Sequence, residues 1–395
     1  MRDIGIDEPS SIRSIAIIAN SAFSIHNFRG PLISEMVARG ITVHALAPDY
    51  DETSRDAVRS IGATPVDISL DRTGLRPLRD LADLIGLVRT LRRLQPDATF
   101  GYFIKPVIYG SMAARIAGVR RRFAMVAGLG YVFTSDGSYM TRRRSLLRWL
   151  TLRLYRVAFS LCERVFFQNP DDIDHFVSAG TLRRAKAVRL MGTGVDLERF
   201  APARPVLRPI RFLLVARLLR EKGISEFVDA ARLVAARHPE CEFILAGNFD
   251  PNPGGIPKQV VEEWVAEGSV QWLGHVDDIR PVIANSSIFV LPSYREGSPR
   301  STQEAMAMER PIITTDAVGC RQTVEEGVNG FLVPVRDAYL LAQAMLKLVE
   351  APHLIPEMGR QSRRLAEDRF DVRRVNATML AAMGIRHERA AAASE

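Results

Sequence analysis

The sequence predicts an α/β protein with two doubly wound parallel-sheet domains, each Rossmann-like, that face a cleft. Apolar runs typical of buried strands alternate with helical segments along the chain, as parallel sheets require. The length of 395 residues suits two domains better than one core. Three prolines within residues 201–209 separate two such series and mark the join between the domains.

The first series starts with the apolar run at residues 14–20. A helix over residues 31–39 ends at Gly40, and a strand over residues 41–48 completes a βαβ unit. The further expected elements are a helix at 78–94, a strand at 98–103, a helix from Tyr109, and strands at 123–127 and 164–168.

The second series starts directly after the join. Its expected elements are strands at 210–216, 241–247, 270–274, 287–292 and 311–315, with helices at 227–237 and before Met308. We therefore expect domains at residues 1–203 and 204–370, followed at 371–395 by a helix that can cross back to the first domain and a loose tail. Open parallel sheets bind ligands beyond the carboxyl ends of their strands, so the site is expected there.

Composition narrows the compartment and the partners. Residues 1–203 carry 29 Lys and Arg against 20 Asp and Glu, whereas the remainder carries 24 against 25. This one-sided charge favours an anionic partner, which could be nucleic acid, anionic lipid or a phosphorylated acceptor. Three widely spaced cysteines argue against a disulfide framework or a zinc site and favour a reducing compartment. Neither a signal peptide nor a transmembrane helix is expected.

Two patterns argue against other chemistries. No GxGxxG follows the first strand, and the half-pattern Gly128-Leu129-Gly130 has Phe133 where the third glycine would stand, so a nicotinamide site is not expected. Asp172 and Asp174 form an Asp-x-Asp, but the residues around them favour a helix start rich in acids over a metal site. No metal is expected.

The segment REGSPRSTQEAMA, residues 295–307, leaves an expected strand and enters a helix. Ser298 is a good N-cap and Pro299 a good first helical residue, and a helix start after a strand is an anion site. The alternative is a capping box of Ser301 and Glu304, which would leave Glu304 without a role in a site. Glu296 could equally be a loop carboxylate.

Two cations follow the first strand of the second domain, Arg217 and Lys222 in ARLLREKG. Both can reach a phosphate at the carboxyl edge of the sheet, Arg217 as a fork and Lys222 as a point charge. Taken alone, the pair could also be a solvated, charged turn.

Together these elements resemble a known family. ARLLREKG, LGHVDDI, EGSPRSTQE and VGCRQTVEEGVNGFLVPVRD look like the donor domain of family 4 retaining glycosyltransferases of GT-B fold, and MGTGVDLERFAP looks like the segment before their interdomain linker. NFRG, GYFIKPVIYG and AGLGYVFT are similar to members that act on polyprenyl-diphosphate-linked sugars in bacterial surface polysaccharide or glycan assembly.

The resemblance implies roles for residues. The first domain would bind the acceptor and the second the nucleotide sugar. Arg217 and Lys222 would hold the leaving diphosphate, and Glu304 the ribose hydroxyls. The donor sugar would contact Glu296 and the backbone of Gly297, Ser298, Pro299 and Arg300, and the base would lie near the backbone of His275 and Val276. Many members carry a histidine in the region matching residues 126–133, and this chain has none there. His26 is a possible substitute, and Lys105 a possible phosphate contact.

Residues 141–161 combine arginines with apolar residues. On a helical wheel Leu146, Leu147, Leu150, Leu154, Val157, Ala158 and Leu161 share one arc. Such a helix can lie on an anionic membrane or serve as a core helix with extended arginines.

We therefore expect a retaining glycosyltransferase that moves a sugar from a nucleotide donor to a polyprenyl-diphosphate-linked saccharide. The donor is expected to be UDP-linked, and no cofactor is expected. It would be cytoplasmic and peripheral on the inner face of the cell membrane, and no nucleic acid would be a partner. The rival interpretations are a UDP-sugar 2-epimerase of the same fold and a non-catalytic membrane-binding module.

Overall fold

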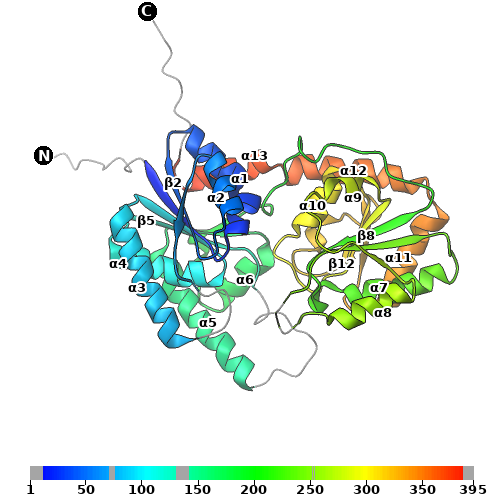
Figure 1. Ribbon diagram of the computed structural model, residues 1–395, viewed down its shortest axis with the longest axis horizontal. Coiled ribbons are helices and arrows are strands. Elements are labelled where there is room, and N and C mark those ends of the chain that lie inside the picture. The colour runs from blue at the N-terminus through cyan, green and yellow to red at the C-terminus, as the bar shows by residue number, and fades with distance from the viewer. Residues whose placement is uncertain (1–11, 71–75, 130–141, 251, 253, 386–395) are drawn as a thin grey trace, which may run out of the picture. The chain divides into compact units, whose positions relative to one another are not determined.

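The computed structural model describes residues 12–70, 76–129, 142–250, 252 and 254–385, with the side chains of residues 142–144 excepted. The chain forms two compact units (Figure 1). Among the described residues, unit 1 holds those before residue 130, those from 142 to Leu190, and those from Arg373 onward, whereas unit 2 holds Met191–Val372. Each unit has its own hydrophobic core.

Unit 1 is built on a seven-stranded sheet in the order β3-β2-β1-β4-β5-β6-β7, and every pair of neighbours is parallel. The order reverses at β1, whose last four residues are fully buried. The strands are β1 Ser14–Ile18, β2 Thr42–Ala47, β3 Thr64–Asp67, β4 Ala98–Tyr102, β5 Arg121–Val126, β6 Arg164–Phe167 and β7 Ala187–Arg189. The predicted parallel sheet is confirmed, and the two edge strands β3 and β7, which are short and only partly buried, are additions to it.

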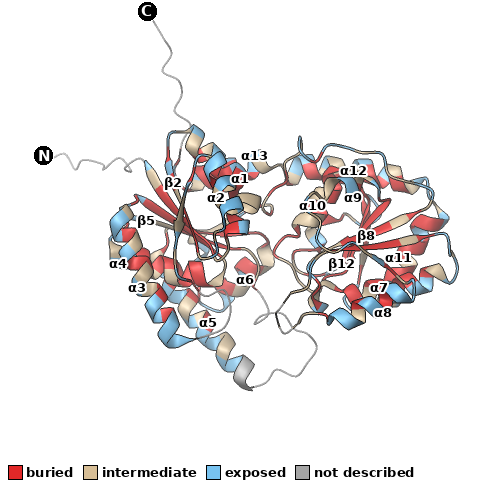
Figure 2. Cartoon of the chain, viewed as in Figure 1, coloured by how far each residue is buried: buried red, intermediate tan, exposed pale blue. Residues whose placement is uncertain are grey.

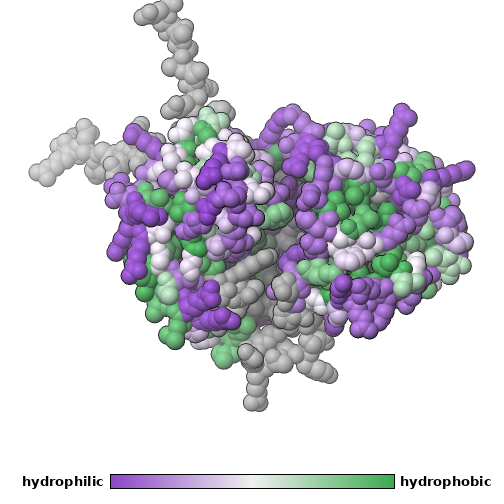
Figure 3. All heavy atoms as spheres, viewed as in Figure 1, coloured by the Kyte–Doolittle hydropathy of each residue, from purple (hydrophilic) through white to green (hydrophobic). Residues whose placement is uncertain are grey.

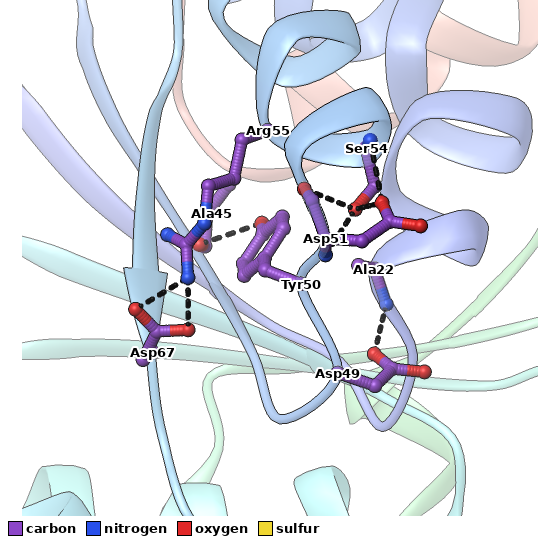
Figure 4. A network of polar contacts seen from close by, with 8 residues as sticks. All are labelled: Ala22, Ala45, Asp49, Tyr50, Asp51, Ser54, Arg55 and Asp67. Carbon is purple, nitrogen blue, oxygen red and sulfur yellow. Dashed lines mark hydrogen bonds and ion pairs between the residues drawn. The ribbon is translucent and has the colours of Figure 1, made fainter.

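Helix α1 corrects one expectation. It begins at Ala22, well before the expected start at residue 31, so Pro31 lies in its interior and His26 lies in a helix and not in a loop. The Ala22 N–H donates to Asp49 Oδ1 at 2.6 Å, and Figure 4 shows Asp49 reaching Ala22 from the segment after β2. This helix start is stabilised by a residue distant in sequence, which local patterns do not reveal.

The segment after β2 also holds the unpredicted helix α2. Asp51 and Ser54 form a capping box at its start. Arg55, one turn on, donates to both oxygens of Asp67 at the end of β3, at 2.7 and 2.8 Å, and lies over the ring of Tyr50 (Figure 4). These contacts tie the outer edge of the sheet to the helix that precedes it.

The remaining helices of unit 1 follow the expected alternation. With α1 and α2 they are α1 Ala22–Ala38, α2 Glu52–Ser60, α3 Pro77–Leu94, α4 Ser111–Ala117, α5 Arg142–Leu161 and α6 Pro170–Ser178. The side of α5 that packs inward holds Thr151, Tyr155, Ala158 and Phe159. The predicted apolar arc of this helix is therefore divided between the core and an exposed side.

Unit 2 contains a second parallel sheet of six strands in the order β10-β9-β8-β11-β12-β13. Its strands are β8 Arg211–Val215, β9 Glu242–Ala246, β10 Gln271–Trp272, β11 Ile288–Leu291, β12 Ile312–Thr315 and β13 Gly330–Val333. Figure 2 shows that the strands of both sheets are largely buried, as the near-continuous apolar runs predicted. The reversal point of this sheet is β8, which lies between β9 and β11.

Helices cover this second sheet, and the chain then re-enters unit 1. They are α7 Ile224–Ala235, α8 Lys258–Ala266, α9 Arg280–Ala284, α10 Arg300–Ala307, α11 Ala338–Glu350 and α12 Leu354–Arg369. The last helix, α13 Val372–Ala382, belongs to unit 1 from Arg373 onward. Met379, Leu380, Met383 and Ile385 lie in the core of unit 1. Among the described helices, none combines the length and the apolar character needed to cross a bilayer.

Candidate active site

The turn after β8 places two cations at the carboxyl edge of the second sheet. Arg217 follows the strand directly, and Lys222 ends a short 3₁₀ turn, Arg220–Lys222. Gly223 follows with φ +70°, and a Cβ there would lie 2.1 Å from the carbonyl oxygen of Pro292. This position therefore requires glycine, and the tight contact holds the β8 turn against the segment that leaves β11.

Lys222 meets Glu296 across these two turns. Because β8 and β11 are parallel neighbours, their carboxyl ends emerge side by side. The Lys222 ammonium lies 2.5 Å from Glu296 Oε1, which also accepts a hydrogen bond from the Ser293 hydroxyl at 2.9 Å. Both charged side chains are mostly shielded from solvent. The structure thus joins two residues that the sequence placed 74 positions apart.

The backbone of the Glu296 segment is fixed from a third strand. The Glu296 N–H donates to the carbonyl oxygen of Val318 at 2.9 Å, in the segment after β12. Gly319 has φ +80°, and a Cβ there would approach the carbonyl oxygen of Glu296 to 2.3 Å. Glycine at this position permits the close approach of the two backbones.

Helix α10 starts one residue later than expected, and the prediction of Ser298 as its N-cap is wrong. Pro299 occupies the N-cap position without a side-chain cap, and the helix begins at Arg300. The Ser298 hydroxyl instead accepts a hydrogen bond from Gln303 Nε2 at 2.7 Å, so it is not directed at the first backbone N–H groups. Gly192, with φ +78°, packs against this Ser298–Gln303 pair.

Glu304 lies in the second turn of α10 and pairs with Arg300 at 2.8 Å. Its side chain is only 12% exposed. Burial raises the pKa of Glu304, and the charge and hydrogen bond of Arg300 partly oppose that rise. No side-chain cap is present at the start of this helix, so the capping box of Ser301 and Glu304 does not form.

Arg217 is held by Asp250, a residue that sequence reasoning missed. Arg217 Nη1 donates to Asp250 Oδ2, while Asp250 Oδ1 accepts the Asn252 N–H at 3.0 Å. The Asp250 side chain is 5% exposed and that of Arg217 52%. Burial acts to raise the pKa of Asp250, but the hydrogen bonds and the Arg217 charge outweigh it and hold the pKa below its usual value. The Asp-x-Asn spacing is an Asx-turn pattern that the sequence does carry.

The remaining expected site residues are His275, Val276 and Lys105. His275 and Val276 follow β10; the His275 side chain is 55% exposed and lies 3.2 Å from Asp277. Lys105 belongs to unit 1, where it is buried and pairs with Asp80 at 2.8 Å; Tyr109 donates to the same carboxylate. This buried pair gives Lys105 a structural partner, and a contact with phosphate stays a prediction.

Two further expectations concern unit 1. Asp172 lies in the first turn of α6, which begins at Pro170, and its N–H donates to the side chain of the N-cap residue Asn169. The predicted acidic helix start is therefore confirmed. The segment matched to the family histidine is only partly described: Val126 ends β5 and Leu129 is buried, whereas Gly130 to Phe133 lie outside the described residues. No group of three or more potential metal-ligating residues occurs in the described part of the chain.

Comparison with known proteins decides the family. The model of glycosyltransferase family 4 matches residues 32–199, and the model of group 1 glycosyl transferases matches residues 209–351. The chain is a glycosyltransferase with a family 4 domain and a group 1 domain. The two matched regions flank the proline-rich segment, and the second contains Arg217, Lys222, Glu296 and Glu304.

Individual relatives agree with this assignment. The glycosyltransferase is 27% identical over 354 residues to the N,N'-diacetylbacillosaminyl-diphospho-undecaprenol alpha-1,3-N-acetylgalactosaminyltransferase of Campylobacter jejuni. That alignment covers 85% of this chain and 89% of the relative. It is 25% identical over 290 residues to the UDP-Gal:alpha-D-GlcNAc-diphosphoundecaprenol alpha-1,3-galactosyltransferase of Escherichia coli, covering 69% and 71%. HepE of Anabaena, solved with UDP-glucose, has a TM-score of 0.72 at 18% identity, covering 94% and 99%. The glycosyltransferase has the GT-B fold.

Proposed function

We propose that this glycosyltransferase moves a sugar from a UDP-linked donor to a saccharide carried on a polyprenyl diphosphate, with retention of the anomeric configuration. The observation that carries the donor half is the contact between Lys222 and Glu296, which brings a cation and a carboxylate from two strand ends to one place. The acceptor half is supported by the two relatives whose names specify undecaprenol-diphosphate-linked acceptors.

The chemistry of the leaving group explains why cations are needed. Breaking the bond between the anomeric carbon and phosphate leaves negative charge on the nucleoside diphosphate. Arg217 and Lys222 are fixed at the strand edge, so they stabilise that charge where it develops and need little reorganisation. An acidic leaving group of this kind requires no strong general acid, in contrast to glycoside hydrolysis.

The two carboxylates then have binding roles. Glu296 would accept hydrogen bonds from the donor sugar, with the backbone from Gly297 to Arg300 beside it, and Glu304 would accept from the ribose hydroxyls. Thr302 Oγ1 and Gln303 Oε1 are buried polar atoms with no hydrogen-bond partner among the described residues. Buried polar atoms of this kind need a partner, which a bound donor or an ordered water can supply.

Access to a lipid-linked acceptor implies a position at the membrane. We propose that the enzyme lies peripherally on the inner face of the cell membrane, because nucleotide sugars are substrates of the cell interior. The excess of basic residues in residues 1–203 favours an anionic membrane surface.

Thermal-shift screening against UDP, GDP, UDP-sugars and GDP-sugars tests the donor. We expect UDP and UDP-sugars to raise the melting temperature through mass action, and the variants Lys222→Ala and Glu304→Ala to lose that shift. A shift with GDP compounds alone would contradict a UDP donor. Assay with a short-chain polyprenyl-diphosphate saccharide, read by NMR at the new anomeric carbon, tests the acceptor and the retention; isomerisation of the donor without acceptor would favour the epimerase instead.

A further inference from the structure

Three helices of unit 1 cover the same face of its sheet. Leu87 of α3 and Ala113 of α4 pack in one cluster with Ile18 of β1. Phe159 of α5 packs on Phe167 of β6, with 6.1 Å between ring centroids, whereas the adjacent Phe166 faces the opposite core. Helix α4 contacts both α3 and α5. The sides of these helices that point away from the sheet therefore belong to one layer (Figure 1).

The outward side of α5 exposes large apolar side chains at helical spacing. Leu146, Trp149, Leu150 and Val157 are 65%, 54%, 40% and 47% exposed, respectively. Arg153 belongs to the same stripe and lies 5.2 Å above the Trp149 ring. The solvent-facing side of a helix is normally polar or charged, so an exposed stripe of large apolar side chains indicates a binding surface.

Helix α3 extends this apolar surface, and α4 adds to it. Leu78, Leu81 and Ile85 of α3 are 86%, 53% and 44% exposed, and Ile116 of α4 is 53% exposed. Figure 3 shows hydrophobic and strongly polar residues interspersed over the part of unit 1 that holds α3 and α5 in Figure 1. Leu78, Leu81 and Ile85 recur at helical spacing along α3, and Ile116 lies on the neighbouring helix α4 near Arg92, so exposed apolar side chains recur across this layer.

Charge on this layer is of one sign. The acidic residues within α3, α4 and α5 are Asp80 and Asp83, and both are buried. Asp80 accepts hydrogen bonds from Lys105 and Tyr109, and Asp83 accepts one from Ser69. The exposed charged side chains described on these helices are arginines: Arg79, Arg89, Arg92, Arg93, Arg115, Arg153 and Arg156. A surface with apolar side chains, a tryptophan and arginine but no exposed acid matches an anionic bilayer interface.

We propose that the outer surface of α3, α4 and α5, here called the docking face, binds an anionic lipid bilayer. The proposal rests on the proposed function, because a polyprenyl-linked acceptor is presented at such a surface. Arginines attract the lipid head groups, and the exposed Leu, Ile and Trp side chains enter the interfacial region between them. Trp149 and Arg153 are positioned as a pair that can reach the apolar and the charged layers together.

Flotation with vesicles of phosphatidylcholine and phosphatidylglycerol tests the docking face. We expect the wild type to float with these vesicles at low salt and to bind pure phosphatidylcholine vesicles far less. Trp149→Ser should weaken partitioning about tenfold, from the transfer free energy of a large side chain. Arg89→Gln and Arg153→Gln should each weaken it about fivefold and flatten the salt dependence.

Matched controls lie on unit 2. Leu233→Ser on α7 removes a leucine that is 44% exposed, and Arg360→Gln on α12 removes an exposed arginine. Both should float as the wild type does. Because all of these positions are exposed, the variants should keep the wild-type melting temperature, which shows that lost binding is not lost folding.

The result that overturns the docking face is a wild type that does not bind anionic vesicles at low salt, or docking-face variants that float as well as the controls. Self-association that these variants abolish, without vesicle binding, would assign the face to a second copy of the chain and equally overturn it. Transfer to a water-soluble short-chain acceptor separates the two proposals: a wild type that transfers but does not float refutes only the docking face, and one that floats but does not transfer refutes only the proposed function.

Discussion

Replacing Asp250 by Asn isolates the restraint on Arg217. Asp250 uses its two oxygens for different tasks: Oδ1 accepts from Asn252 and shapes the loop, whereas Oδ2 accepts from Arg217. Asparagine keeps the first oxygen and presents an NH₂ group to the guanidinium in place of the second. The loop should therefore keep its turn, while Arg217 loses its partner and its fixed orientation.

The exposure of Arg217 sets the size of the effect. A hydrogen bond to a charged group contributes about 1.5–3 kcal/mol when it is shielded. Because the Arg217 side chain is 52% exposed, screening by water reduces the expected loss to about 0.5–1 kcal/mol. Charge on the diphosphate develops fully only as the bond breaks, so the loss should appear mainly in kcat, as a decrease of about two- to fivefold.

Initial rates over a range of donor concentrations, at saturating acceptor, measure this effect. We expect kcat to fall while the KM for donor changes less than about twofold, and the melting temperature should stay close to that of the wild type. In an Arg217→Ala background, Asp250→Asn should have no further effect on kcat, because the interaction is already lost. An unchanged kcat with tighter donor binding would refute the positioning role and show that Asp250 only competes with the diphosphate.

Three further predictions concern the same site. Lys222→Ala and Glu304→Ala should each lower transfer by about 10²- to 10³-fold with the fold retained by circular dichroism, and near-wild-type rates in either would contradict the assigned roles. Because the pKa of Glu304 is raised above 4.5, the folded protein holds this proton more tightly than the unfolded chain does. The free energy of unfolding of the wild type, relative to that of Glu304→Gln, should therefore fall as the pH rises above about 4.5. Denaturant titrations measure this difference, and a difference that stays flat or rises with pH would contradict the prediction. Gly319→Ala should destabilise the fold by more than about 1 kcal/mol in denaturant titrations and lower transfer, because its Cβ would displace the Glu296 carbonyl; a fully active, equally stable variant would show that the loop adjusts freely.

The sequence predicted the parts of the fold that rest on local pattern. Apolar runs revealed the central strands of both sheets, and the expected pairing of strand ends at one edge agrees with the contact between Lys222 and Glu296. Asp172 was correctly assigned to a helix start because Asn169 and Pro170 carry a strong local signal. These features depend on residues a few positions apart, or on general rules of parallel sheets.

The features that sequence reasoning missed depend on distant contacts. The start of α1 is stabilised by Asp49, and Ser298 is drawn away from capping by Gln303. Asp250 becomes the partner of Arg217 only because the segment after β9 packs against the turn that holds Arg217. The inward side of α5 is likewise decided by the aromatic residues it meets, which a helical wheel does not contain.

The return of the chain to unit 1 has a consequence for biosynthesis. Met379, Leu380 and Met383 complete the core of unit 1, yet they are translated after the whole of unit 2. Among the described residues, unit 2 runs without interruption from Met191 to Val372, whereas unit 1 is completed by residues on both sides of it and keeps an open apolar surface until its last helix has been made. During synthesis the unit that is begun first is therefore the one whose core is completed last.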